Sequence, residues 1–191
     1  MPPLIRLSIA LLPLFLLSCV DVGTAAERAQ KARLLSHDLQ QLSPKVSATE
    51  ADKVAITAVE ESAKMSLDFK PVCFPWMNNG LVNIGLRKRG LCYQWRDDLF
   101  PHLHRLGLKT MDLHLTSSRR ATLREHNGIV VTAKGQRFEE GIVLDPWRHG
   151  GRLWWGRLSD DPKHPWKPLP RELTPVILRP LLMPGQSPVS R

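Results

Sequence analysis

The hydrophobic periodicity of this chain changes at Gly107. Before this residue, apolar side chains recur three and four positions apart, as on one face of a helix. This spacing predicts helices over 27–42, from Ser47 or Thr49 to before Pro71, and over 92–106. After Gly107, short segments rich in β-branched residues alternate in polarity and predict strands over 111–115, 129–133, 142–144 and 152–158. Helices followed by strands predict an α+β fold, with helices packed on an antiparallel sheet and two of them preceding the core domain.

Prolines mark the remaining segments. Residues 69–80 hold two prolines and an Asn pair and read as an irregular connection, and the Pro-rich residues 161–191 read as an extended tail that wraps the body. We therefore predict four parts. These are a signal peptide (1–18), an N-terminal helical segment (19–70), a core domain (71–160) and a C-terminal tail (161–191).

The N-terminus contains an apolar run, Leu7–Leu17, that is shorter than the roughly 20 residues of a membrane-spanning helix. It is typical of a secretory signal peptide. The following Leu16-Leu17-Ser18-Cys19 resembles the lipobox of bacterial lipoproteins. The resemblance implies that Cys19 carries a lipid anchor of palmitate type and that the chain lies in the cell envelope, facing the periplasm. The alternative is ordinary signal cleavage near the small residues 23–26.

The chain is basic, with 27 Lys+Arg against 18 Asp+Glu and a formal charge of +9. Such a charge suits an anionic partner. Because an exported protein is separated from the nucleic acids of the cell, we expect no nucleic-acid partner. The expected partners are a cell-wall peptide or another envelope protein, together with the membrane that holds the anchor. The alternative is that the excess charge only solvates the surface.

The segment around Gly135-Gln136 has the composition of a two-residue hairpin turn. A turn centred there places His126 directly opposite Asp145 on one face of the sheet, with Cβ atoms about 5 Å apart. A bulge near residues 139–141 would shift this register. The pattern therefore predicts an imidazole–carboxylate pair.

Cys92 begins the third predicted helix, where unpaired N–H groups and the helix dipole favour a thiolate. Together with the predicted pair it would form a catalytic triad. Cys92 would be the nucleophile, His126 the general base and acid, and Asp145 the residue that orients His126. The chemistry of such a triad is acyl transfer on an amide bond.

The stretch 88–147 resembles the transglutaminase-like branch of the papain-like cysteine hydrolases. The resemblance lies in Gly90 and Cys92 opening a helix that ends at Leu106-Gly107, His126 starting a strand and Asp145 ending the next. It implies a papain-like core and a cysteine amidase or peptidase, with transglutaminase activity as the lesser possibility, and no cofactor. An oxyanion hole would use the Cys92 N–H and an upstream amide, Asn79 or Asn83. The chain departs from the family at Asn127-Gly128, where an aromatic residue is common.

Two alternatives stay open. Cys73 and Cys92 are an even pair in an oxidising compartment and could form a structural disulfide. Such a disulfide would mean either a redox-latent enzyme or a non-catalytic domain. The second alternative is a catalytically inactive envelope scaffold with the same fold, which binds a partner through its basic, Trp-rich surface. The histidines show no zinc-like spacing, so no metal is expected. His114 is expected in a strand, facing solvent or lining the site, and five others are expected at the surface: His37, His102, His104, His149 and His164.

Overall fold

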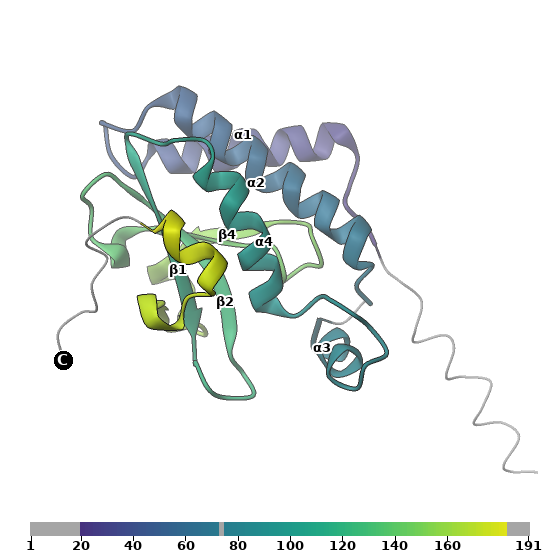
Figure 1. Cartoon of the computed structure of the whole chain (residues 1–191). Coiled ribbons are helices and arrows are strands. Elements are labelled where there is room, and N and C mark those ends of the chain that lie inside the picture. Colours follow the sequence, from purple (N-terminus) through teal and green to yellow (C-terminus); the bar gives the residue numbers. More distant parts are fainter. Residues whose placement is uncertain (1–19, 73–74, 183–191) are drawn as a thin grey trace, which may run out of the picture.

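The fold was taken from a computed structural model, which describes residues 20–72 and 75–182 (Figure 1). The predicted signal peptide, the predicted lipidation site Cys19 and the possible disulfide partner Cys73 lie outside the described residues. Within the described part of the chain, no helix is both long and apolar enough to cross a membrane.

Four α-helices occupy the first half of the chain: α1 (Ala25–Gln40), α2 (Ala48–Phe69), α3 (Pro75–Asn83) and α4 (Cys92–His104). The predicted start of α2 is confirmed, because the Ser47 side chain accepts the Glu50 N–H as an N-cap. Thr24 caps α1 through a capping box with Glu27. The prediction of an irregular connection over 69–80 was wrong over 75–80, because α3 begins there. This helix forms although its residues have low helix propensity.

The sheet has five strands: β1 (Met111–Ser118), β2 (His126–Ala133), β3 (Ile142–Asp145), β4 (Trp154–Arg157) and β5 (Trp166–Pro168). Their order is β4-β3-β2-β1-β5, and all neighbouring strands are antiparallel. The α+β prediction is therefore confirmed. The short edge strand β5 was missed, and its proline is tolerated because an edge strand leaves one side unpaired.

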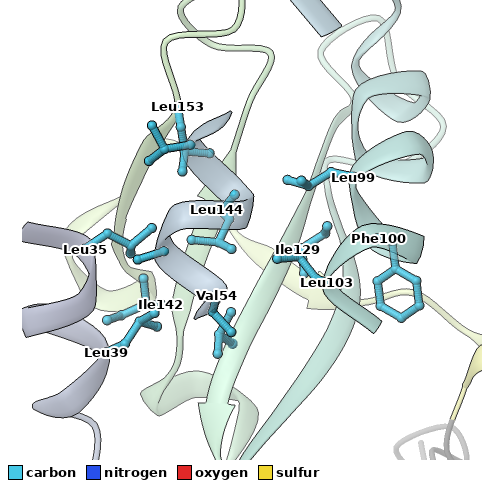
Figure 2. Close-up of a cluster of buried hydrophobic side chains, with 14 of the residues drawn as sticks. Leu35, Leu39, Val54, Leu99, Phe100, Leu103, Ile129, Ile142, Leu144 and Leu153 are labelled. Carbon is cyan, nitrogen blue, oxygen red and sulfur yellow. The ribbon is translucent and has the colours of Figure 1, made fainter. Parts of the chain in front are cut away.

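The main core lies between the helices and one face of the sheet (Figure 2). Leu35 and Leu39 of α1, Val54 of α2 and Leu99 of α4 are buried there with the sheet residues Ile129, Ile142 and Leu144. The opposite face carries a smaller cluster of Val130, Val143 and Trp166. These two sets alternate along β2 and β3, as side chains of a sheet buried on both faces must.

The β2–β3 register differs from the predicted one by two residues. Ile129 pairs with Leu144, and continuing this register places Asp145 opposite Gly128 and not opposite His126. Side-chain direction alternates with period two, so a shift of two residues preserves the face. His126 and Asp145 consequently remain on one face as diagonal neighbours, which long side chains can bridge.

The connection between β2 and β3 explains the shift. Residues 134–141 contain the 3-10 helix η3 (Phe138–Glu140), so the predicted two-residue turn at Gly135-Gln136 was wrong. Gly135 adopts φ +74° in this longer connection.

The C-terminal segment is folded as far as residue 182, in contrast to the predicted extended tail. It forms β5 and the 3-10 helices η5 (Arg171–Leu173) and η6 (Val176–Leu181). Leu178 and Leu182 enter the main core, and η6 lies against α4 (Figure 1). Their burial holds this segment on the domain despite its prolines.

Candidate active site

Cys92 is the first residue of α4 and follows a tightly held turn at Gly90. The Gly90 carbonyl accepts hydrogen bonds from Asn78 Nδ2 at 3.0 Å and Trp95 Nε1 at 3.2 Å. Gln94 Oε1 accepts the N–H groups of Gly90 and Leu91 at 2.8 and 3.0 Å. Gly90 has φ +125°, and a Cβ there would clash with Asn78. The glycine two residues before the thiol is therefore required by the turn that presents it.

Cys92 has a free thiol, and the residue is buried, with 7% of its surface exposed. One side chain and one carbonyl near the start of β2 contact its sulfur. It accepts a hydrogen bond from Asn127 Nδ2 at 3.4 Å and donates one to the Glu125 carbonyl at 3.7 Å. Asn127 is itself oriented by Arg96 Nη1, which donates to Asn127 Oδ1 at 2.5 Å. Arg96 lies one turn along α4 and is 3% exposed. The side chain next to His126 thus points to the thiol and is fixed by a buried guanidinium.

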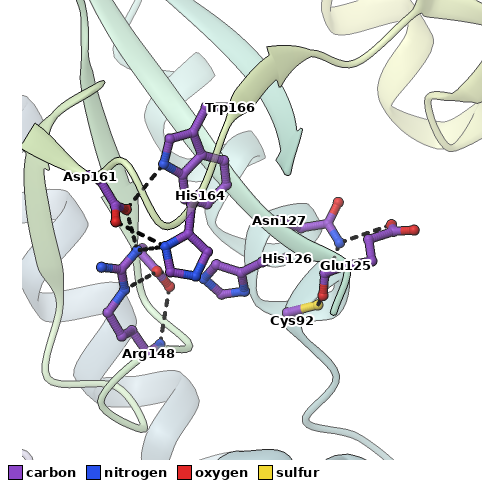
Figure 3. Close-up of polar contacts among 9 residues, drawn as sticks. Cys92, Glu125, His126, Asn127, Arg148, Asp161, His164 and Trp166 are labelled. Atoms are coloured by element: carbon purple, nitrogen blue, oxygen red, sulfur yellow. Dashed lines mark hydrogen bonds and ion pairs between the residues drawn. The ribbon is translucent and has the colours of Figure 1, made fainter. Parts of the chain in front are cut away.

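His126 and Asp145 form the predicted imidazole–carboxylate pair. His126 Nε2 lies 2.6 Å from Asp145 Oδ2, and both side chains are buried. The other ring nitrogen, Nδ1, has no hydrogen-bond partner among the described residues. His126 lies between Cys92 and the cluster formed by Arg148 and Asp161 (Figure 3). Its free nitrogen is therefore available for proton exchange, while Nε2 is held by the carboxylate.

The electrostatic surroundings make His126 unusually basic. Burial lowers the pKa of the imidazole, but the charge and hydrogen bond of Asp145, together with the nearby Cys92 sulfur, outweigh it and raise the pKa to about 9. For Asp145, burial raises the pKa, but His126 and then Arg148 reverse this effect and hold it below its usual value. At neutral pH the pair is therefore an imidazolium and a carboxylate. The sulfur contributes to this pKa although its hydrogen bonds go to Asn127 and Glu125.

A second ionic layer, not predicted from the sequence, lies behind Asp145. Arg148 donates from Nε to Asp145 Oδ2 at 2.8 Å and from Nη2 to Asp161 Oδ2 at 2.6 Å. Asp161 also accepts from Trp166 Nε1 at 3.2 Å, and its Oδ1 lies 2.9 Å from His164 Nδ1. The surface position predicted for His164 was wrong, because this pairing holds it half-buried. In the local sequence, the only feature that could have indicated this ionic layer is Arg148, three residues after Asp145.

Aromatic rings surround His126. Its ring centroid lies 4.8 Å from that of Trp147, 5.2 Å from that of His164 and 5.4 Å from that of Trp166. A Cβ at Gly128 would lie 3.0 Å from Val143 Cγ2 and 3.1 Å from the Leu144 carbonyl. The glycine after Asn127 thus allows β3 to pack closely against β2 beside the site.

The two predicted oxyanion amides lie on α3. Asn83 is exposed, and Asn79 Oδ1 is buried without a hydrogen-bond partner among the described residues. No hydrogen bond found in the described part of the chain joins either amide to Cys92, His126 or Asp145. The structure brings the three triad residues together, and it places Asn127 instead of these amides at the sulfur. An oxyanion role for Asn79 or Asn83 stays a prediction.

The other histidines lie apart from the triad. His37 and His149 are exposed, and His102 and His104 are half-buried. His114 lies half-buried on β1, with Nε2 2.9 Å from Thr132 Oγ1. Across residues 20–72 and 75–182, no three His, Cys, Asp or Glu side chains gather in a way that could hold a metal ion.

A groove of about 440 Å³ opens beside the thiol. Its lining includes Asn127 and Glu125, the two residues that hydrogen-bond to the Cys92 sulfur, and Arg96. Its volume falls within the range of about 300–1,000 Å³ that is usual for ligand sites.

Compared with known proteins, the chain matches no family model, no curated protein and no solved structure at a significant level.

Proposed function

We propose that this chain is a thiol acyl-transfer enzyme with a papain-like, transglutaminase-like core, in which Cys92, His126 and Asp145 act as a triad. The observation that carries the proposal is the buried His126, bonded through Nε2 to Asp145 at 2.6 Å, with Nδ1 unpartnered and Cys92 close enough to raise its pKa. A histidine held in this way has one nitrogen free for the thiol proton. Structural histidines, by contrast, satisfy both nitrogens when buried.

In the acylation step, the neutral form of His126, which is the minor form below about pH 9, takes the Cys92 proton on Nδ1, and the thiolate attacks the carbonyl carbon of an amide. The C–S bond forms, and the carbonyl electrons move to oxygen. As the tetrahedral intermediate collapses, the C–N bond breaks and the imidazolium returns its proton to the leaving amine. The products are a thioester on Cys92 and a free amine.

In the deacylation step, neutral His126 takes a proton from water, and the hydroxide attacks the thioester carbonyl. The C–S bond breaks and the proton returns to the thiolate, leaving a carboxylic acid. An amine in place of water would give a new amide, the transglutaminase outcome. Hydrolysis is favoured because water is abundant in the compartment that the N-terminal sequence predicts.

The substrate is inferred from the predicted compartment. The lipobox-like sequence ending at Cys19 predicts a domain in the cell envelope, anchored by lipid and facing the periplasm. The amides available there belong to cell-wall peptide and envelope proteins. We therefore propose a cysteine amidase or peptidase that acts on one of these.

A catalytically inactive scaffold is the second candidate, and one observation favours it. Residue Cys92 is buried, with 7% exposure, and the hydrogen bonds of its sulfur go to Asn127 and Glu125, not to His126. In this case the charged network would serve stability alone. Catalytic hydrogen bonds are, however, often long in unliganded enzymes and tighten only with substrate, so this geometry is compatible with activity.

A stopped-flow burst experiment with p-nitrophenyl acetate separates the two candidates. The enzyme should release p-nitrophenolate in a burst of one equivalent per chain and carry an acetyl group on Cys92 by peptide mass spectrometry. The Cys92→Ser variant should lose the burst, whereas Cys73→Ser, the matched control, should keep it. A burst that appears only after reduction would indicate a Cys73–Cys92 disulfide. No Cys92-dependent burst in the fully reduced protein would exclude the enzyme.

A further inference from the structure

The groove beside Cys92 lies between three segments that are far apart in the sequence. These are the start of α4, the loop from residue 119 to 125 between β1 and β2, and the C-terminal segment around η5. Asn127 and Glu125, which contact the sulfur, line this groove, whereas Cys92 itself is not part of the lining. A ligand bound in the groove therefore lies against the two residues that hold the thiol.

The two acidic side chains of the groove differ in their partners. Asp97 forms an ion pair with Arg96 at 2.7 Å. Glu125 accepts the Ala121 N–H at 2.8 Å and Asn127 Nδ2 at 3.2 Å, which are neutral donors. Arg96 therefore balances the charge of Asp97, whereas Glu125 keeps its negative charge.

The basic side chains of the loop are not matched. Arg119, Arg120 and Arg124 are exposed, and we find no ion pair or side-chain hydrogen bond for them within the described ranges. The loop itself is held in place, since Thr122 Oγ1 donates to the Arg119 carbonyl at 2.7 Å. Arg120 lines the groove directly. Together, these three unpaired arginines of the loop outnumber the one carboxylate of the groove, Glu125, that has no cationic partner among the described residues.

The wall opposite the loop is apolar. Leu169, Leu173 and Pro175 line it, and Leu173 is 45% exposed. Tyr93, 44% exposed, adds an aromatic side chain from α4. A ligand that fills this groove would gain stability from burying these exposed apolar groups.

We infer that this groove binds the acyl donor, and that the donor is an acidic peptide segment whose carboxylate pairs with Arg120 and whose neighbouring apolar side chain packs on Leu173. The inference rests on the proposed function, because it takes Cys92 as the nucleophile. A concave site that is lined by Asn127 and Glu125, the two residues on the sulfur, suits a chain with an amide to present. A flat anionic membrane would contact only its rim.

Peptide electrophiles test the groove on the purified, reduced full chain. Chloroacetyl-Leu-Glu-amide, its Leu-Gln and Leu-Lys analogues and simple chloroacetamide all alkylate a thiol, which forms a C–S bond and releases chloride. Labelling of Cys92 is followed by mass spectrometry, and each peptide rate is divided by the chloroacetamide rate. We expect the Glu probe to react about two- to fivefold faster than the Gln probe, as an exposed ion pair allows, and the Lys probe to react slowest.

The variants assign the effect to residues. Arg120→Gln should abolish the preference for Glu over Gln, whereas Arg33→Gln, which removes an exposed arginine from α1, should retain it. Leu173→Ser should slow all three peptide probes and leave chloroacetamide unchanged. Equal rates for the three probes on the unmodified chain, or the same preference in Arg120→Gln, would overturn the inference.

Two further results separate this inference from the proposed function. If chloroacetamide does not modify Cys92, the proposed function fails, and the groove is tested by anisotropy with fluorescein-Leu-Glu-amide. Weaker binding to Arg120→Gln than to Arg33→Gln then supports the acidic-peptide groove, and equal binding overturns it. Sedimentation with phosphatidylglycerol vesicles that depends on Arg120, without any preference among the peptide probes, would overturn it in favour of a membrane surface.

Discussion

The charge of Asp145 should control the protonation of His126, and Asp145→Asn tests this directly. The substitution keeps the size and planarity of the side chain but removes the charge from a fully buried position 2.6 Å from the imidazole. With the carboxylate gone, burial becomes the dominant influence on His126, and its pKa should fall from about 9 to near or below the ordinary 6.5. At 1.36 kcal/mol per unit, this loss corresponds to about 3 kcal/mol.

The sign of the pH dependence follows from the raised pKa. A group that is more basic in the folded protein stabilises it fully below its unfolded pKa, and this contribution is lost as pH rises through the folded value. The stabilisation from His126 should therefore be present at pH 6 and lost between about pH 6.5 and 9. Asp145 remains ionised throughout this range, because its own pKa is lowered.

Urea unfolding at pH 6 and pH 10 measures this contribution, and NMR titration of the His126 ring measures the pKa. Asp145→Asn should lose about 3 kcal/mol more at pH 6 than at pH 10. The control Asp98→Asn, which breaks the surface pair with Arg89, should lose less than about 1 kcal/mol at either pH. In the burst assay, Asp145→Asn should react about 10³–10⁴-fold more slowly, as in other triads. A His126 that titrates near 6.5 in the unmodified protein, or equally in both proteins, would refute the reasoning.

Three further substitutions probe the packing. Gly151→Ala should lower the free energy of unfolding by about 1–3 kcal/mol, because φ is +99° and a Cβ would lie 2.7 Å from the Ser62 carbonyl. The control is Gly80→Ala, since there is open space around Gly80. Equal melting temperatures for the two variants would contradict the expectation. Arg148→Met should cost about 3 kcal/mol by leaving two buried carboxylates without their shared cation, and a loss below about 1 kcal/mol in urea unfolding would show that the network is dispensable. Leu99→Ala should cost about 2–5 kcal/mol in the same assay, since the side chain is fully buried, and a smaller loss would mean that the core closes around the cavity.

The predicted elements that agree with the structure rest on local chemistry. The helix start at Ser47 follows from a hydroxyl that can accept an N–H of the first turn, which needs no distant partner. The shared face of His126 and Asp145 survived a register error of two residues, because the side-chain period of a strand is also two. A shift of one residue would have separated them.

The missed elements depend on distant contacts. Strand β5 has three residues and a proline, and it exists because β1 offers an unpaired edge. Helix α3 forms from residues with weak helix propensity, which tertiary context can override. His164 seemed to be a surface residue of a Pro-rich tail, but its ring centroid lies 5.2 Å from that of His126, which comes from another part of the chain. No local pattern reports such contacts.

The sequence by itself determined that helices precede strands, that a cysteine begins a helix and that His126 and Asp145 share a face, since periodicity and capping act over a few residues. Only the tertiary structure decided what surrounds them: Asn127 on the sulfur, the guanidinium of Arg148 behind Asp145, and the groove beside Arg120. These features join segments up to about eighty residues apart in the chain. They arise because burying the apolar faces of the helices and the sheet in one core brings those segments together.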